Sequence, residues 1–278
     1  PFGPNGEPSA IGKERVTVPL HLSVSGLLGD EQGDRLHHGG PDKALHHYPG
    51  EHYAFWRREL PHVVAERFST GGFGENLATA GLTEQSVCVG DIFRLGSALI
   101  QVSQARQPCW KLNIRFGVPN MAQRVQESAR TGWYYRVLES GDVAPESEIR
   151  LIERRHEDWP LARLLHHLYA DPLNSAALKD IAALSVLAPS WRRLVAQRLV
   201  HLLGLAPLAQ SLELVDIDAY GQRARAHAAA EGLEDVVVAL FGAGLVVHIT
   251  RKVSDIGLAL EAKQVVGEER TYQPVGLR

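Results

Sequence analysis

The segment 34–49 carries the densest set of chemically active side chains in the chain, DRLHHGGPDKALHHYP. It holds four histidines, two acids and two bases around a Gly-Gly-Pro turn. Adjacent glycines let backbone amides approach a ligand closely, and Lys43, directly after the turn, can neutralise an oxyanion such as a phosphate. The segment therefore indicates an anion-binding loop, although a polar turn whose histidines bond backbone carbonyls explains the same residues.

A second glycine-rich element, residues 71–74, is followed by Glu75, Asn76 and an expected strand. It lacks the Lys-Ser/Thr pair of a P-loop and the strand-to-helix context of a dinucleotide-binding fingerprint. Glu75 and Asn76 would instead present an acceptor and an amide, and amides recognise heterocyclic edges through paired donor and acceptor contacts. A tight turn with a self-bonded Asn is the alternative interpretation.

The chain has two cysteines, Cys88 and Cys109, too few for a disulfide framework. Cys109 follows an expected strand and a proline, and the positive charges of Arg106 and Lys111 favour the thiolate, which binds soft metals. Cys88 reads as a buried strand residue, and a lone cysteine is often only a small hydrophobe. A further alternative for Cys109 is zinc, shared with the histidines at 37, 38, 46 or 47, but no metal-binding spacing supports it.

The net charge, the apolar stretches and the absence of common motifs argue against several classes of function. With 29 Lys+Arg against 32 Asp+Glu, the net charge of -3 gives no general reason to bind a nucleic acid polymer or an anionic membrane. The longest apolar stretch, 236–247, is interrupted by glycines and is shorter than the ~20 residues of a membrane-spanning helix. No G-x-S-x-G, Walker A or H-E-x-x-H motif occurs. Since no secretory signal is recognised, we expect a cytoplasmic protein without a membrane span.

Two kinds of element must position these residues. Residues 1 to about 155 are rich in Gly, Pro and alternating apolar runs, which predict the strands of a barrel or sandwich. The runs 16–24 and 93–102 and the aromatic segment 132–137 are the expected strands, and two short helices interrupt them at 51–59 and 120–128, the second capped by Asn120.

Leu/Ala-rich segments with helical spacing follow from Trp159, and the pairs Asp171-Pro172 and Pro189-Ser190 mark their joints. Three helices are predicted, over 160–170, 174–184 and 189–204. Beyond 205 the signals mix, with a helix expected over 222–230 and strands over 235–241 and 244–250.

These patterns predict an α+β fold of three domains. Residues 1–156 form a mainly β barrel, 157–204 a three-helix domain, and 205–278 a mixed α/β C-terminal extension of unknown role.

The order of the motifs resembles the MOSC domain family, and specifically its bacterial YiiM branch. The matching stretches are 9–13, 26–34, 38–44, 72–77, 89–91 and 102–112. The helical part, 159–192, is similar to the three-helix segment that follows the barrel in YiiM proteins, so the resemblance covers residues 9 to about 200. The remaining tail resembles nothing, and because it has no cysteine it is no plant-type ferredoxin module.

The resemblance implies a β-barrel protein that binds the molybdenum pyranopterin cofactor (molybdopterin). It also implies an oxidoreductase that reduces N-hydroxylated bases and amidoximes, an activity of the kind that detoxifies 6-N-hydroxylaminopurine. In this family the cysteine after Gln-Pro, here Cys109, supplies a sulfur to molybdenum, and His38 is the expected proton donor. The expected cofactor-binding residues are Lys13, Asp34, Lys43, Glu75, Asn76, Arg106 and Tyr134.

The expected partners are a small N-hydroxylated substrate and an external reductase that donates electrons, and a homodimer is a further expectation. An alternative hypothesis uses the same residues without turnover: Cys109 carries sulfur as a persulfide, or the pocket ferries the cofactor. A third is a binding module that keeps the fold alone.

Overall fold

The computed structural model describes residue 9, residues 11–31 and 39–202, and the backbone of four strands between 212 and 250. The chain forms two compact units. The first comprises residues 1–174 and 185–194, and the second comprises 175–184 and 195–278.

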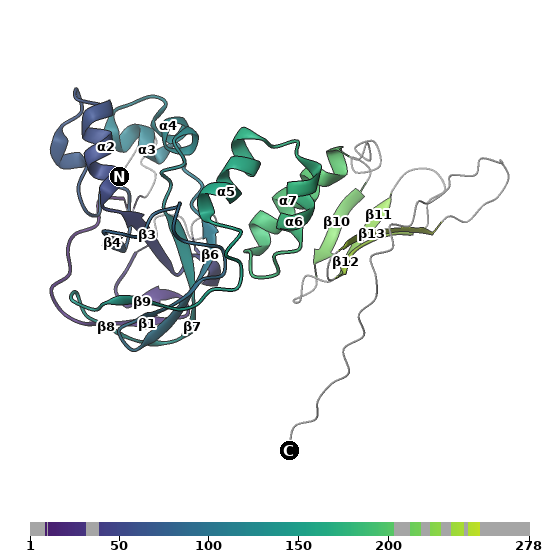
Figure 1. Cartoon of the computed structure of the whole chain (residues 1–278), viewed down its shortest axis with the longest axis horizontal. Coiled ribbons are helices and arrows are strands. Elements are labelled where there is room, and N and C mark those ends of the chain that lie inside the picture. The colour runs from purple at the N-terminus through teal and green to yellow at the C-terminus, as the bar shows by residue number, and fades with distance from the viewer. Residues whose placement is uncertain are drawn as a thin grey trace, which may run out of the picture. The chain divides into compact units, whose positions relative to one another are not determined.

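The first unit is built on a six-stranded sheet of order β4-β3-β7-β6-β5-β9 that curls into a half barrel (Figure 1). Only β3 and β4 pair in parallel, so the sheet is mixed. Its strands are β3 (Leu45–Pro49), β4 (Leu77–Thr79), β5 (Ile92–Leu95), β6 (Ala98–Ala105), β7 (Trp133–Glu139) and β9 (Ile149–Glu153). A second sheet has the order β2-β1-β8, from β2 (Gly26–Leu27), β1 (Leu20–Ser23) and β8 (Gly141–Val143).

Three short helices gather at one end of the half barrel: α2 (Glu51–Glu59), α3 (Lys111–Phe116) and α4 (Met121–Glu127) (Figure 1). Together with β3 they enclose an aromatic core. Tyr48 of β3 stacks on Phe73 with ring centroids 4.1 Å apart, and Phe68 stacks on Phe116 at 4.7 Å. Aromatic burial of this size stabilises a fold strongly, so this core fixes the glycine-rich turn that contains Phe73. The core is composed of Tyr48, Tyr53, Trp56, Leu60, Val63, Phe68, Phe73, Leu112, Phe116, Val118, Met121 and Val125.

The three predicted C-terminal helices are confirmed. They are α5 (Leu161–Leu165), which continues as the π-helical turn η3 (His166–Ala170), then α6 (Ser175–Ala182) and α7 (Pro189–Leu202). Their apolar faces are buried as the 3.6-residue spacing requires. Short 3-10 turns η1 (Pro41–Lys43) and η2 (Ala65–Arg67) complete the described elements of the first unit.

Several local expectations need correction. The alternating run 16–24 forms a strand only from Leu20, and Val16 and Val18 are exposed. Asn120 precedes α4, but its side chain makes no capping bond, because its Oδ1 accepts from Arg124 Nε at 3.0 Å. Cys88 is buried as expected, although it forms an isolated bridge with Pro160 rather than part of a strand.

In the second unit, four antiparallel strands follow one another in the order β10-β11-β12-β13. They are β10 (Leu212–Ile217), β11 (Arg223–Ala228), β12 (Asp235–Phe241) and β13 (Gly244–Thr250). The last two strands were predicted at these positions. The helix expected over 222–230 is wrong: the sequence RARAHA alternates polar residues with alanine at period two, which suits a strand.

Candidate functional site

Cys109 lies just beyond the end of β6. The backbone N–H of Arg106, the first residue after the strand, donates to the carbonyl of Gly132 at 3.0 Å, which fixes where the chain leaves the sheet. Cys109 is only partly buried, and its carbonyl accepts from the N–H of Leu112 at 3.0 Å as α3 begins. Cys109 therefore sits at a strand-to-helix junction and is partly accessible.

Tyr134 of β7 brings Arg106 and Cys109 into one environment. Burial raises the pKa of the Tyr134 hydroxyl, the charge and a hydrogen bond of the Arg106 guanidinium act against that rise, and the charge of Cys109 adds to it. The β6–β7 register places Tyr134 opposite Gln104, two residues before Arg106, and Cys109 follows Arg106 by three residues. We call Tyr134, Arg106 and Cys109 the Cys109 cluster.

His46 of β3 faces the same cluster. It is the register partner of Tyr134 across the β3–β7 pair, and the two rings lie 5.0 Å apart. Burial lowers the pKa of His46 well below its usual value, and the positive charges of Arg106 and then Lys13 lower it further, while a backbone hydrogen bond to Gly74 opposes them. His46 is thus a neutral imidazole among cations at neutral pH.

Two buried polar atoms of this cluster have no hydrogen-bond partner. They are Nη1 of Arg106 and Nε2 of His46. A buried polar group without a partner costs about 1–3 kcal/mol, and more when it is charged. A buried guanidinium nitrogen without a protein partner is suited to bind an anionic or strongly polar group.

The glycine-rich turn borders the cluster, and Glu75 holds it in shape. The Glu75 carboxylate is buried and accepts from the N–H of Gly71 at 2.6 Å, from the N–H of Phe73 at 2.9 Å and from the Tyr53 hydroxyl. Both carboxylate oxygens are thus occupied by protein donors. The contacts of Glu75 are those of a residue that shapes the turn.

Asn76 joins this turn to β3 and to Lys13. Its N–H donates to the carbonyl of His46 at 2.8 Å, and its Oδ1 accepts from the N–H of His46 at 2.9 Å. Its Nδ2 donates to Asp30 Oδ2 at 2.9 Å. Lys13 Nζ bonds both oxygens of the same Asp30, at 2.5 and 2.6 Å, so one carboxylate links two predicted cofactor-binding residues.

Behind the cluster, a buried pair supports the loop that carries Gly132. Glu84 accepts from Gly132 N–H at 2.7 Å and lies 2.7 Å from Nε2 of His52. A Cβ on Gly132 would lie 2.3 Å from the carbonyl of His47 and 3.1 Å from Nε2 of His46. Only glycine therefore lets this loop pass so close to β3.

Hydrogen bonds and strand pairing thus connect the segments that carry six of the predicted site residues. These residues are Lys13, Glu75, Asn76, Arg106, Tyr134 and Cys109. Lys43 lies in η1, which packs on β6 and β7, and Ser103 of β6 donates to the carbonyl of Asp42 at 2.6 Å. His38 and Asp34 lie outside the described residues.

The sequence suggested His46 only as one of several histidines in the zinc alternative, and not as a cofactor-binding residue. Strand pairing could have found it, because Tyr134 and a residue opposite it across the sheet must share a face. Its neighbour His47 points the other way, and its ring nitrogens lie 3.0 Å from the Tyr135 hydroxyl and 2.9 Å from Thr79 Oγ1. Both ring nitrogens of His47 already have partners within the protein, so His47 is not available as a zinc ligand.

The half-barrel sheet, the glycine-rich turn and the cysteine after β6 define an α+β protein of the MOSC-domain class. Residues 34–150 match the MOSC domain, and residues 159–202 match the YiiM-like, 3-alpha helix domain. Protein YiiM of Escherichia coli is 45% identical over 197 residues, which cover 70% of this chain and 86% of YiiM. The chain therefore belongs to the YiiM family of MOSC-domain proteins.

Other relatives agree with this assignment. The uncharacterized protein YflK of Bacillus subtilis is 44% identical over 66% of this chain and 81% of its own. A protein of Gibberella moniliformis named reductase is 40% identical over 54% of this chain, but over only 27% of its own length. The crystal structure of E. coli YiiM superposes with a TM-score of 0.63 and 39% identity, covering 70% of this chain and 91% of its own.

Within the part of the chain that the structure describes, no helix combines the length and the apolarity needed to cross a membrane.

Proposed function

We propose that this protein binds the molybdenum pyranopterin cofactor with Cys109 as a metal ligand and reduces N-hydroxylated compounds such as hydroxylated bases and amidoximes. The observation that carries the proposal is the position of Cys109, which is partly exposed where the chain leaves β6 and follows three residues after Arg106, whose Nη1 is buried without a hydrogen-bond partner. MOSC domains are generally associated with this cofactor, and one relative is named a reductase.

The residues present fit such a group. A phosphorylated pterin brings an anion and a polar heterocycle, and the buried unpartnered atoms of Arg106 and His46 are suited to both. The phosphate would be held by Arg106, Lys43 and Lys13. Lys13 also bonds the carboxylate of Asp30. Asn76, Asp34 and Tyr134 would line the pterin, and Glu75 would act by holding the turn.

When bound, the cofactor would supply a redox-active metal that exchanges two electrons and accepts oxygen. The protein's share is to present the Cys109 sulfur, to exclude competing ligands and to manage protons. Reduction of an N-hydroxyl group to an amine consumes two electrons and two protons and releases water. His38 would supply one proton, because an imidazole titrates near neutral pH. An external reductase in the cytoplasm would return the electrons.

The test is a comparison of turnover in two cysteine variants. The full chain is purified from a molybdenum-replete host that makes the cofactor, and benzamidoxime reduction is measured with a chemical electron donor. We expect wild type and Cys88→Ser to be active and Cys109→Ser to lose at least about a hundredfold in kcat, since a lost metal ligand removes the site chemistry. Cys88 is the matched control, a buried thiol whose pKa burial raises.

Undiminished turnover in Cys109→Ser would refute the proposal. Native mass spectrometry distinguishes the reductase from the carrier hypothesis. An extra sulfur atom on Cys109, without molybdenum or turnover, would indicate sulfur transfer rather than catalysis.

A further inference from the structure

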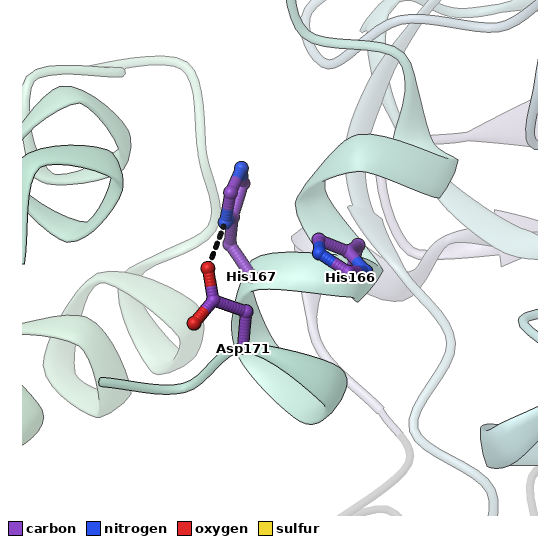
Figure 2. Close-up of side chains that lie close together, drawn as sticks. All are labelled: His166, His167 and Asp171. Carbon is purple, nitrogen blue, oxygen red and sulfur yellow. Dashed lines mark ion pairs between the residues drawn. The ribbon is translucent and has the colours of Figure 1, made fainter. Parts of the chain in front are cut away.

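A second constellation of metal-ligating side chains lies away from Cys109, on the helical segment of the first unit. His166, His167 and Asp171 each offer one ligand atom, and these three atoms all lie within 4.8 Å of one another. Figure 2 shows the three side chains on the same turn, with the Asp171 carboxylate beside a ring nitrogen of His167.

The π-helical turn η3 is what brings these residues together. The N–H of Asp171 donates to the carbonyl of His166 at 2.8 Å, the five-residue bond that defines a π turn. Such a turn places residue i+5 beneath residue i, and the adjacent rings of His166 and His167 have centroids only 5.2 Å apart. Single π turns inside α-helices occur frequently at functional sites.

The contacts within the group are not those of a self-contained hydrogen-bonded cluster. Nδ1 of His167 is buried and makes no hydrogen bond, although it lies 3.5 Å from Oδ2 of Asp171. Asn174 Nδ2 donates to the same Asp171 oxygen at 2.9 Å. An orienting amide on a ligating carboxylate and an unpartnered imidazole nitrogen opposite it are features of a metal site with its outer shell in place.

We infer that His166, His167 and Asp171 bind a divalent transition-metal ion, with zinc the preferred class. Two imidazoles and one carboxylate are a ligand set that zinc uses, with a fourth position left to water. Tetrahedral zinc ligands at ~2.1 Å lie roughly 3.4 Å apart, so a small inward rotation of the exposed His166 ring closes the site. The trio offers no thiolate, which distinguishes it from Cys109.

The site has a structural consequence for the neighbouring loop. Tyr169, in the same π turn, accepts a hydrogen bond at 3.3 Å from Gln107 Nε2, two residues before Cys109. An ion that pins η3 therefore also restrains the segment that leads to Cys109, although metal binding itself does not depend on the proposed function.

The test is zinc binding by calorimetry on the chelator-treated full chain. Wild type should bind one zinc ion through this trio, and His167→Ala and Asp171→Asn should each weaken it by at least about tenfold, the scale of losses at metal sites. His62→Ala, which removes an exposed histidine outside the trio, should leave the affinity unchanged. Zinc should also raise the Tm of wild type and not of the two trio variants, whose metal-free Tm reports whether they fold.

Cys109→Ser should keep full zinc affinity. If Cys109→Ser abolishes zinc binding while His167→Ala does not, the ion binds at the thiol and the inference is overturned. Equal affinity in wild type, His167→Ala and Asp171→Asn would overturn it as well.

Discussion

At the residue scale, the cluster around Cys109 combines cationic groups with one histidine, His46, that stays neutral. Arg106 carries a buried nitrogen without a partner, and His46 beside it has a pKa held low by burial and by that positive charge. The pair offers an anion one charged donor and one neutral imidazole. Charge-assisted hydrogen bonds to a buried guanidinium are among the stronger polar contacts in proteins.

Replacing Arg106 should therefore weaken cofactor retention. Arg106→Gln loses a charged donor worth about 1.5–3 kcal/mol, so we expect roughly a 10- to 100-fold weaker hold on the cofactor. Molybdenum content after gel filtration measures it. Arg94→Gln is the matched control, because Arg94 forms an exposed ion pair with Glu139 at 3.3 Å and such pairs contribute little. Equal loss in both variants would contradict the role of Arg106.

His47 predicts a dependence of stability on pH. Burial lowers its pKa from 6.5 to about 3, so between these values the unfolded chain binds more protons than the folded one. The stabilising contribution is complete above pH 6.5 and is lost as the pH falls toward about 3, by up to about 1.4 kcal/mol per pH unit. Denaturant unfolding of wild type and His47→Gln at several pH values measures it. An unchanged slope in the variant would contradict this assignment, and the exposed His62→Gln should keep the wild-type slope.

At the element scale, hydrophobic periodicity predicted most of the helices and strands. The remaining features depend on contacts between residues far apart in the sequence. The helices after Trp159 follow from Leu/Ala spacing and proline joints, which are local signals. The helix α3 (Lys111–Phe116) was missed because six residues without a capping side chain carry almost no local signal. The role of Glu75 could not be predicted either, since its donors include Tyr53, which is distant in sequence.

Gly132 offers a test of how tightly the loop before β7 packs on β3. It has φ +69°, and an added Cβ would meet the His47 carbonyl at 2.3 Å. Gly132→Ala should therefore lower the free energy of unfolding by more than about 3 kcal/mol, from strain and overpacking together. Gly29→Ala is the control, because Gly29 has φ +83° but open space around it, and it should cost only about 1 kcal/mol. Equal losses in urea unfolding would contradict this view of the loop.

At the scale of the whole molecule, the family matches end at residue 202 while the chain continues to 278. The four strands β10 to β13 therefore lie outside both matched regions. The expected homodimer and the domain boundaries at 156 and 204 stay predictions, which the mass of the native particle and limited proteolysis can test.

A chain ended at residue 204 should remain folded, because both family matches end by residue 202 and 91% of the E. coli YiiM chain is matched by this protein. We expect a cooperative thermal transition and an unchanged near-ultraviolet circular dichroism of the tryptophans, all of which precede residue 204. Loss of the cooperative transition would instead show that the second unit, which includes 175–184, needs its C-terminal strands.

The proposed bond between molybdenum and the Cys109 sulfur can be measured directly. X-ray absorption at the molybdenum edge counts the sulfur atoms bound to the metal, in wild type and in Cys109→Ser loaded in the same host. We expect one fewer sulfur ligand in the variant. An identical sulfur count in two molybdenum-containing proteins would contradict it.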